Sequence, residues 1–263
     1  MKKTLAALSA LGLLAGCATG PAIDRSYTAA SQDSRAQYLI IHFTASDFAP
    51  ALKTLTQEQV SSHYLVRDDP PTIYQLVDEN RRAYHAGVSS WKGQTALNAA
   101  SIGIEVVNVG DRQGPNGVEY ADFPKPQVDA LMGLVKDIVA RHEIRGDRIL
   151  GHSDIAPMRK VDPGPKFPWK RLADEGLIPW PDAARVAEKR ALYETALPDI
   201  AWFQKKLAEH GFNIVQSESY DEMTVRVLSA FQMKYRPARY DGVPDPESAA
   251  ILDVMTSSPG NAP

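Results

Sequence analysis

The chain has 263 residues, of which 44% are hydrophobic and 23% charged, and its formal net charge is −3 at pH 7. This length suits about two domains. An acidic chain without basic clusters argues against nucleic acid as a partner. A single cysteine, Cys17, argues against a fold held together by disulfides.

The first 17 residues have the pattern of an export signal. Lys2 and Lys3 precede an apolar run at residues 5–14, which is too short to span a bilayer, since a spanning helix needs roughly 20 residues. The run ends in Leu14-Ala15-Gly16-Cys17, which resembles the lipobox of bacterial lipoproteins. Because Ala18 rather than Asp follows, we expect a lipid anchor in the outer membrane, facing the periplasm. The alternative is an ordinary signal peptide with a chance cysteine.

Strands and helices alternate after this leader. Residues 18–35 are small and polar and are expected to form a tether. Apolar runs predict five strands, at residues 37–43, 63–67, 73–77, 102–107 and 149–150. The turn at 68–71 makes the second and third of them a hairpin. Helices are predicted at 54–62 and 125–143. The alternation indicates an α/β domain over residues 36–180.

A small helical module is predicted at the C-terminus. Residues 181–196, with proline and charged residues, are predicted to be a linker. Three short helices should follow over 197–258, with Gly211 ending the first and Asp221 and Asp245 capping the next two. The apolar residues of each helix recur on one face, so the three helices can bury a small common core.

Three polar residues stand at or after predicted strand ends, where the sites of α/β folds gather. His42 ends the first strand, and His152 and Asp162 lie in the loop after the last one. Two imidazoles and a carboxylate can hold a tetrahedral zinc ion and leave its fourth position open, as in catalytic zinc sites. Each residue alone has a structural alternative, since Asp162, for example, can start a turn. Together they predict metal-assisted hydrolysis.

Two further residues are candidates for catalysis. Glu105 interrupts the apolar run 102–107, and an ionised carboxylate in a buried strand is costly unless it is paired or close to a metal. It is therefore predicted to act as a general base, with a solvated strand face as the alternative. Lys160 precedes Asp162 by two residues and could stabilise the oxyanion of a tetrahedral intermediate, unless it is an ordinary surface lysine.

Other histidine and tryptophan residues remain open. His85 could be a third imidazole ligand, a substrate contact or a structural residue, whereas His63 is expected to be structural. Trp91 and Trp169 are candidates for lining a substrate groove, and packing in a core is equally compatible with their sequence positions.

Four segments resemble, in order, the type 2 N-acetylmuramoyl-L-alanine amidases, which share a fold with the peptidoglycan recognition proteins. These segments are residues 62–66, 83–87, 101–105 and 152–164. The resemblance covers residues 36–175 and implies a central mixed β-sheet flanked by helices. It also implies one zinc ion held by His42, His152 and Asp162, with Glu105 and Lys160 in catalysis. Some relatives carry a catalytic Tyr where this chain has Ser62, which favours Glu105 as the base.

The resemblance implies a function in the cell wall. The expected reaction is hydrolysis of the amide between N-acetylmuramic acid and the L-alanine of a peptidoglycan stem peptide, and the sequence leaves open whether the anhydro form of the sugar is also accepted. Residues 197–258 resemble the three-helix peptidoglycan-binding module, although a domain that only packs against the amidase is the alternative. Rival functions are a peptidoglycan-binding protein without activity and a peptidase acting within the stem peptide. A monomer is expected.

Overall fold

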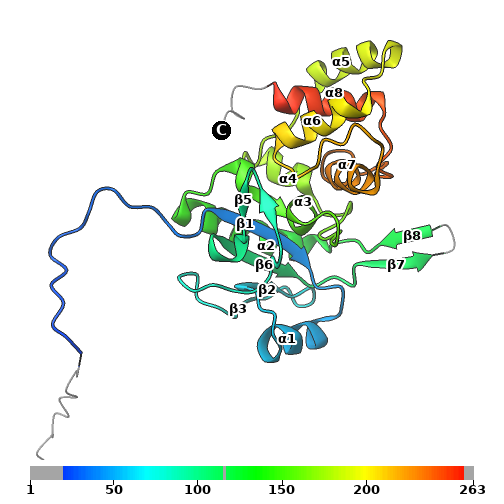
Figure 1. Ribbon diagram of the computed structural model, residues 1–263. Helices are drawn as coiled ribbons and strands as arrows, with labels where there is room; N and C mark the ends of the chain where they lie inside the picture. The colour runs from blue at the N-terminus through cyan, green and yellow to red at the C-terminus, as the bar shows by residue number, and fades with distance from the viewer. Residues whose placement is uncertain (1–19, 115–116, 258–263) are drawn as a thin grey trace, which may run out of the picture. The chain divides into compact units, whose positions relative to one another are not determined.

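The structure is a computed structural model that describes residues 20–114 and 117–257. The predicted export signal and lipobox, with Cys17, lie outside the described residues. Residues 20–33 belong to a separate unit, in which they are exposed and form neither helix nor strand. The second unit starts at Ser34 and holds all the elements of Figure 1. Among the described residues, no helix has the length and apolar character needed to cross a membrane.

A mixed sheet of five strands forms the centre of the second unit (Figure 1). Its order is β3-β2-β6-β1-β9, with β3 antiparallel to β2 and the other neighbours parallel. The strands are β1 (Tyr38–Phe43), β2 (Tyr64–Val66), β3 (Ile73–Gln75), β6 (Ser101–Val106) and β9 (Ile149–Gly151). The five predicted strands and the hairpin are therefore confirmed. Strands β1 and β6 are nearly continuous apolar runs because both of their faces are covered.

Side-chain alternation gives the two sheet faces different partners. Leu39 and Ile41 of β1 and Ile104 of β6 pack against α2 (Lys125–His142), whose buried stripe includes Leu131 and Val135. This helix agrees with the prediction over 125–143. The alternate residues of β1 face the other way, and there they meet the cavity and helices described below.

The helix predicted at 54–62 is misplaced. The structure has α1 at Phe48–Gln57, and Glu58 is already extended. Ala51 and Leu55, one turn apart, are buried against Leu65 and Val107, and this tertiary contact sets the position of the helix. The remaining short elements of this part are β4 (Ser90–Trp91), β5 (Gln94–Thr95), η1 (Leu97–Ala99), β7 (Asp111–Gly114), β8 (Gly117–Tyr120), η2 (Gly146–Arg148), α3 (His152–Ile155) and α4 (Trp169–Asp174).

The three predicted C-terminal helices are present as α6 (Ile200–His210), α7 (Glu222–Tyr235) and α8 (Pro246–Thr256). The Asp221 and Asp245 side chains accept hydrogen bonds from backbone N–H groups in the first turns of α7 and α8. Gly211 ends α6 with a φ of 141°, which a residue with a Cβ rarely adopts.

The stretch predicted as a linker, 181–196, is largely a fourth helix, α5 (Ala183–Thr195). Asp182 caps it, and Tyr193 donates a hydrogen bond of 2.9 Å to Asp253 on α8. Of the charged residues that suggested a linker, Arg185 and Glu188 are exposed, whereas Lys189 pairs with Asp253 of α8 at 2.9 Å. Val186 and Tyr193 supply the apolar contacts of this helix with the others. We call residues 34–180 the sheet part and 181–257 the helical part.

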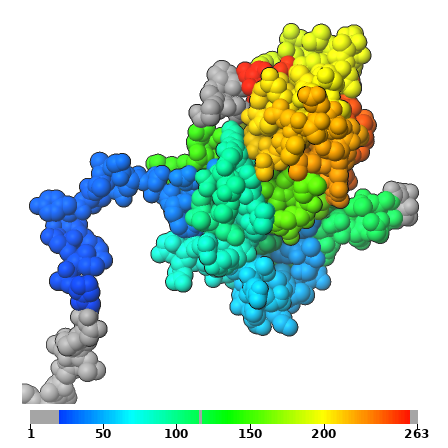
Figure 2. All heavy atoms as spheres, viewed as in Figure 1, coloured from blue at the N-terminus to red at the C-terminus, as the bar shows by residue number. Residues whose placement is uncertain are grey.

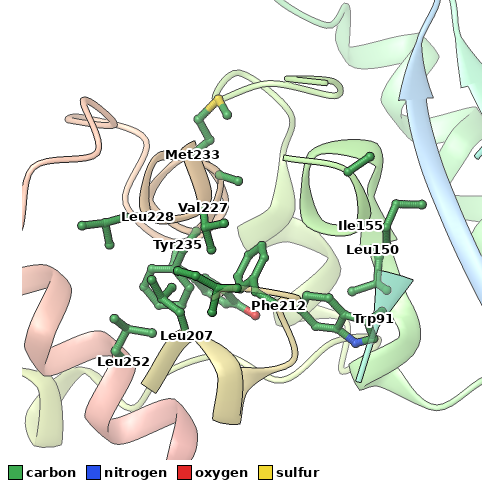
Figure 3. Close-up of a cluster of buried hydrophobic side chains, with 14 of the residues drawn as sticks. Trp91, Leu150, Ile155, Leu207, Phe212, Val227, Leu228, Met233, Tyr235 and Leu252 are labelled. Carbon is green, nitrogen blue, oxygen red and sulfur yellow. The ribbon is translucent and has the colours of Figure 1, made fainter. Parts of the chain in front are cut away.

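The two parts share one hydrophobic core. Trp91, Leu150 and Ile155 of the sheet part belong to the same buried cluster as Phe212 and Tyr235 of the helical part (Figure 3). In the space-filling view the orange and yellow atoms of α6 and α7 abut the green atoms of the sheet part without a visible gap (Figure 2). The helical part is thus packed on the sheet part and is not an independent domain joined to it by a linker.

Candidate active site

A cavity of about 260 Å³ opens at the carboxyl ends of β1 and β6. It brings together all five residues predicted for metal binding and catalysis, namely His42, Glu105, His152, Lys160 and Asp162. His85, for which the sequence allows three roles, lines it too. The carboxyl edge of parallel strands is where ligand sites of α/β sheets form.

Three ligand atoms converge in this cavity. His42 Nδ1 lies 2.9 Å from His152 Nδ1 and 3.1 Å from Asp162 Oδ2, and His152 Nδ1 lies 3.2 Å from the same carboxylate oxygen. All three residues are buried. Ligands of one tetrahedral zinc ion, each about 2.05 Å from it, would lie ~3.3 Å apart, so the observed spacing is close to that of a zinc site.

The hydrogen bonds behind His42 determine which of its ring nitrogens carries the proton. Ser101 Oγ donates to the Leu97 carbonyl (2.7 Å), so it accepts from His85 Nε2 (3.1 Å). His85 Nδ1 is then an acceptor for His42 Nε2, at 3.0 Å. This leaves a lone pair on His42 Nδ1, directed at Asp162 and His152.

His152 has the same tautomer for a simpler reason. Its Nε2 lies 3.2 Å from the carbonyl oxygen of Ala86, which can only accept a hydrogen bond, and 3.4 Å from Arg159 Nη2, which can only donate one. The shorter contact, to the Ala86 carbonyl, favours the proton on Nε2. Its Nδ1 therefore also presents a lone pair to the cluster. Two imidazole lone pairs and a carboxylate that meet without a hydrogen between them fit a bound cation. In metal-ligating histidines, the ring nitrogen that does not face the metal typically donates a hydrogen bond, as both rings do here.

The ionisation states of the site agree with metal binding. Burial lowers the pKa of His42 to about 4, with the neighbouring His152 adding to the effect, so this imidazole is neutral at pH 7. Burial raises the pKa of Asp162, but the adjacent imidazoles of His152 and His42 outweigh this effect and hold the pKa below its usual range. A neutral imidazole and an ionised carboxylate are the forms that bind zinc.

Glu105 lies directly across from His42, in register on the neighbouring strand. Its Oε2 is buried and has no hydrogen-bond partner in the described part of the chain. Burial raises the pKa of this carboxyl well above the ordinary value, the charge of Asp162 raises it further and Lys160 opposes both. Lys160 itself is exposed and lines the same cavity. A carboxyl group with such an oxygen, beside three candidate metal ligands, suits a general base.

Trp91 does not reach this site. It is 2% exposed, its ring meets Phe212 edge-on at 5.2 Å, and its Nε1 donates to the Asp147 carbonyl. The expectation of a substrate contact is corrected, because the helical part covers this face of the residue. Trp169 is likewise buried, and His63 is buried with Arg35 and the Gly103 amide as partners.

Two supporting residues were not found from the sequence. Asn98 Oδ1 accepts hydrogen bonds from the backbone N–H groups of His85 and Ala86. It thereby holds the two residues whose ring and carbonyl group contact His42 and His152. A Cβ on Gly103 would come within 2.5 Å of the His85 ring, so the absence of a side chain makes room for that ring. A glycine inside a strand often marks such an approach, and this signal was available.

Comparison with known proteins assigns the family. Residues 32–165 match the family model of N-acetylmuramoyl-L-alanine amidase, and residues 197–252 match that of a peptidoglycan binding domain. The N-acetylmuramoyl-L-alanine amidase AmiD of Escherichia coli is 41% identical to this chain in an alignment of 275 residues, gaps included, that covers 99% of each chain.

Two solved structures agree with these matches. The complex of AmiD from E. coli with the substrate anhydro-N-acetylmuramic acid-L-Ala-D-gamma-Glu-L-Lys has a TM-score of 0.81 and 41% identity, covering 91% of this chain and 96% of that one. AmpDh3 of Pseudomonas aeruginosa with anhydromuramic pentapeptide has a TM-score of 0.82 and 38% identity, covering 89% and 96%. The chain therefore belongs to the N-acetylmuramoyl-L-alanine amidase family.

Proposed function

We propose that this chain is a zinc-dependent amidase that cleaves the bond between N-acetylmuramic acid and the L-alanine of peptidoglycan stem peptides. The observation that carries the proposal is the meeting of two imidazoles and a carboxylate in a cavity that also holds Glu105, whose buried Oε2 has no hydrogen-bond partner among the described residues. His42, His152 and Asp162 would hold one zinc ion.

Each catalytic residue has a role that follows from its position. A bound zinc ion supplies a Lewis acid that polarises the scissile carbonyl and lowers the pKa of water. Glu105 takes the proton from the attacking water and passes it to the leaving amine of L-alanine. Lys160, which lines the cavity, stabilises the negative charge that develops on the carbonyl oxygen.

The substrate is proposed to include anhydro-muropeptides. Relatives at 41% and 38% identity have solved structures with anhydromuramyl peptides, and both align over about nine tenths of this chain. His85 lines the cavity, but both of its ring nitrogens are engaged in hydrogen bonds, with His42 and Ser101, so we assign it to ligand support and not to zinc binding.

The domain boundaries and location are part of the proposal. Residues 1–17 would be a lipoprotein signal with Cys17 as the lipidated residue, 18–35 a tether, and 36–180 the amidase domain. Residues 197–258 would bind peptidoglycan. The protein would then sit in the outer membrane and face the periplasm. Incorporation of labelled palmitate into the wild type and not into Cys17→Ser would support this, and labelling of both would contradict it.

Mass spectrometry of digested sacculi tests the activity. Free stem peptides that begin with L-alanine are expected from the wild type with zinc, and none from His152→Ala or after chelation. Intact muropeptides with bound protein would instead indicate a binding protein. Shortened stem peptides still attached to muramic acid would indicate a peptidase.

A further inference from the structure

A buried lysine of the helical part reaches the segment that carries His152. The side chain of Lys234, on α7, is 5% exposed. Its Nζ lies 2.7 Å from Asp154 Oδ2, 3.2 Å from the Ile149 carbonyl oxygen and 4.2 Å from the centroid of the Trp169 ring. All three partners belong to the sheet part. Lysine is almost never buried without a partner, because removing its ammonium group from water has a large desolvation cost. The groups of the sheet part that surround Lys234 offset this cost.

The partner Asp154 holds the start of α3. Its side chain is 2% exposed, and Oδ2 accepts a hydrogen bond of 2.8 Å from the Gly151 amide, immediately before the ligand His152. In the same short helix, the Ser153 amide donates to the Asp162 carbonyl at 2.8 Å. Residues 151–154 therefore orient His152, which belongs to the segment, and also hold the backbone of Asp162.

The segment has little room to adjust. A Cβ on Gly151 would lie 2.7 Å from Pro163 Cδ and 3.2 Å from the Trp169 ring. Helices α3 and α7 lie side by side, and Ile155 of α3 belongs to the core that the two parts share (Figure 1, Figure 3). Because Gly151 is tightly packed, we expect a change at the Lys234–Asp154 contact to be transmitted to the ligand loop.

We propose that Lys234 is a positioning residue of the metal site, so that the helical part completes the metal centre of the sheet part. The proposal rests on the zinc site formed by His42, His152 and Asp162. Without the ammonium group, the buried Asp154 carboxylate has lost its counter-charge and must draw in water or turn away from the Gly151 amide. Either response loosens the cap that orients His152 and weakens the metal site.

The test measures zinc binding by the metal-stripped full chain. Lys234→Met keeps the length of the side chain and removes its charge. We expect zinc affinity, measured by competition with a chelator, to fall roughly 10- to 100-fold, as for other residues behind metal ligands. The visible spectrum of the Co²⁺-loaded variant should differ from that of the wild type. Asp154→Asn combined with Lys234→Met should regain most of the affinity, because Asn still accepts from Gly151 and no unpaired charge remains.

Lys206→Met is the matched control. Lys206 is 17% exposed, and its partners Glu209, Asp253 and Thr256 all lie in the helical part. This variant should lose stability and keep its zinc affinity. Wild-type affinity and spectrum in Lys234→Met would overturn the proposal, as would an equal loss of affinity in Lys206→Met. If Lys234→Met does not fold, Lys234→Gln replaces it. Reduced zinc affinity in that variant would support the proposal, and wild-type affinity and spectrum would overturn it. A wild-type chain that binds no zinc would instead refute the proposed function.

Discussion

His42 and Glu105 face each other as register partners on the two central strands of the sheet, β1 and β6. Their side chains point to the same face, so the proposed metal ligand and the proposed proton acceptor border one cavity. The parallel pairing of these strands, more than 60 residues apart in the chain, is what makes the two residues neighbours.

Changing Glu105→Gln should separate metal binding from catalysis. The amide keeps the shape of the side chain and cannot take a proton, so the rate should fall roughly 10²- to 10⁴-fold. Zinc content should stay at the wild-type level because Glu105 is not a ligand. Stem-peptide release measures the rate, and Glu188→Gln on the exposed side of α5 is the control. Full activity of the Glu105→Gln variant with zinc bound would remove Glu105 from the mechanism.

Lys160→Ala should lower kcat by about a hundredfold to a thousandfold, since one donor to the oxyanion is lost. Because Lys160 is exposed, the thermal unfolding midpoint should not change. Lys166→Ala, an exposed lysine on the same loop, should have wild-type activity. Equal rates in the two variants would show that Lys160 is an ordinary surface residue.

Gly103→Ala should disrupt the support of His42. The new methyl group would press on the His85 ring, whose nearest atom lies 2.5 Å from the Cβ position. Loss of the His85 contact should weaken zinc binding roughly 10- to 100-fold. Gly133→Ala is the counterpart in an exposed position of α2, where a Cβ meets nothing within 4 Å. It should raise stability by up to about 1 kcal/mol and leave zinc binding unchanged.

Trp91→Ala should act on stability and not on the substrate. Removal of a buried aromatic ring between the two parts should cost about 3–5 kcal/mol of unfolding free energy. The KM of the remaining folded enzyme should stay close to that of the wild type. Denaturant unfolding and steady-state kinetics check the two effects. A large rise in KM with unchanged stability would restore Trp91 as a substrate contact.

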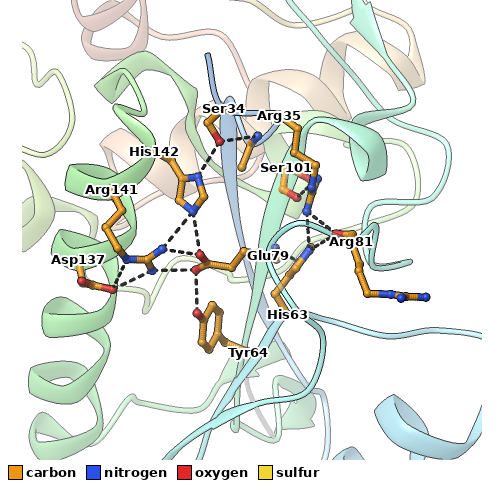
Figure 4. A network of polar contacts seen from close by, with 12 residues as sticks. Ser34, Arg35, His63, Tyr64, Glu79, Arg81, Ser101, Asp137, Arg141 and His142 are labelled. Carbon is orange, nitrogen blue, oxygen red and sulfur yellow. Dashed lines mark hydrogen bonds and ion pairs between the residues drawn. The ribbon is translucent and has the colours of Figure 1, made fainter. Parts of the chain in front are cut away.

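Glu79 should stabilise the chain in a pH-dependent way. It accepts hydrogen bonds from Arg141 and Tyr64 and contacts His142, so it ties a loop to the end of α2 (Figure 4). The Arg141 hydrogen bond is the main cause that lowers its pKa from 4.5 to about 2. A carboxyl with a lowered pKa stabilises the fold above its unfolded pKa, and this stabilisation is lost as pH falls toward 2.

The comparison of the wild type with Glu79→Gln measures this effect. The wild type should be more stable at pH 7 by about 1–2 kcal/mol, a value discounted for partial exposure. The difference should shrink between pH 4.5 and 3. Glu143→Gln, an exposed change just after α2, should show no such trend. A constant difference across this range would mean that the Glu79 charge contributes nothing.

The sequence by itself determined the elements and the chemistry of the site. Apolar runs predicted all five strands of the central sheet, and the caps Asp221 and Asp245 marked α7 and α8, because these signals lie within a few neighbouring residues. The types and order of His42, Glu105, His152, Lys160 and Asp162 indicated a hydrolytic metal site, since few other sites need that set.

Only the tertiary structure decided which residues meet across the chain. The place of α1, the helix at the predicted linker and the burial of Trp91 all depend on packing partners that are distant in sequence. The same holds for His85 over Gly103 and for Lys234 against Asp154. Local patterns say which face of an element is apolar, but not which surface covers it. That choice follows from the packing of the whole core.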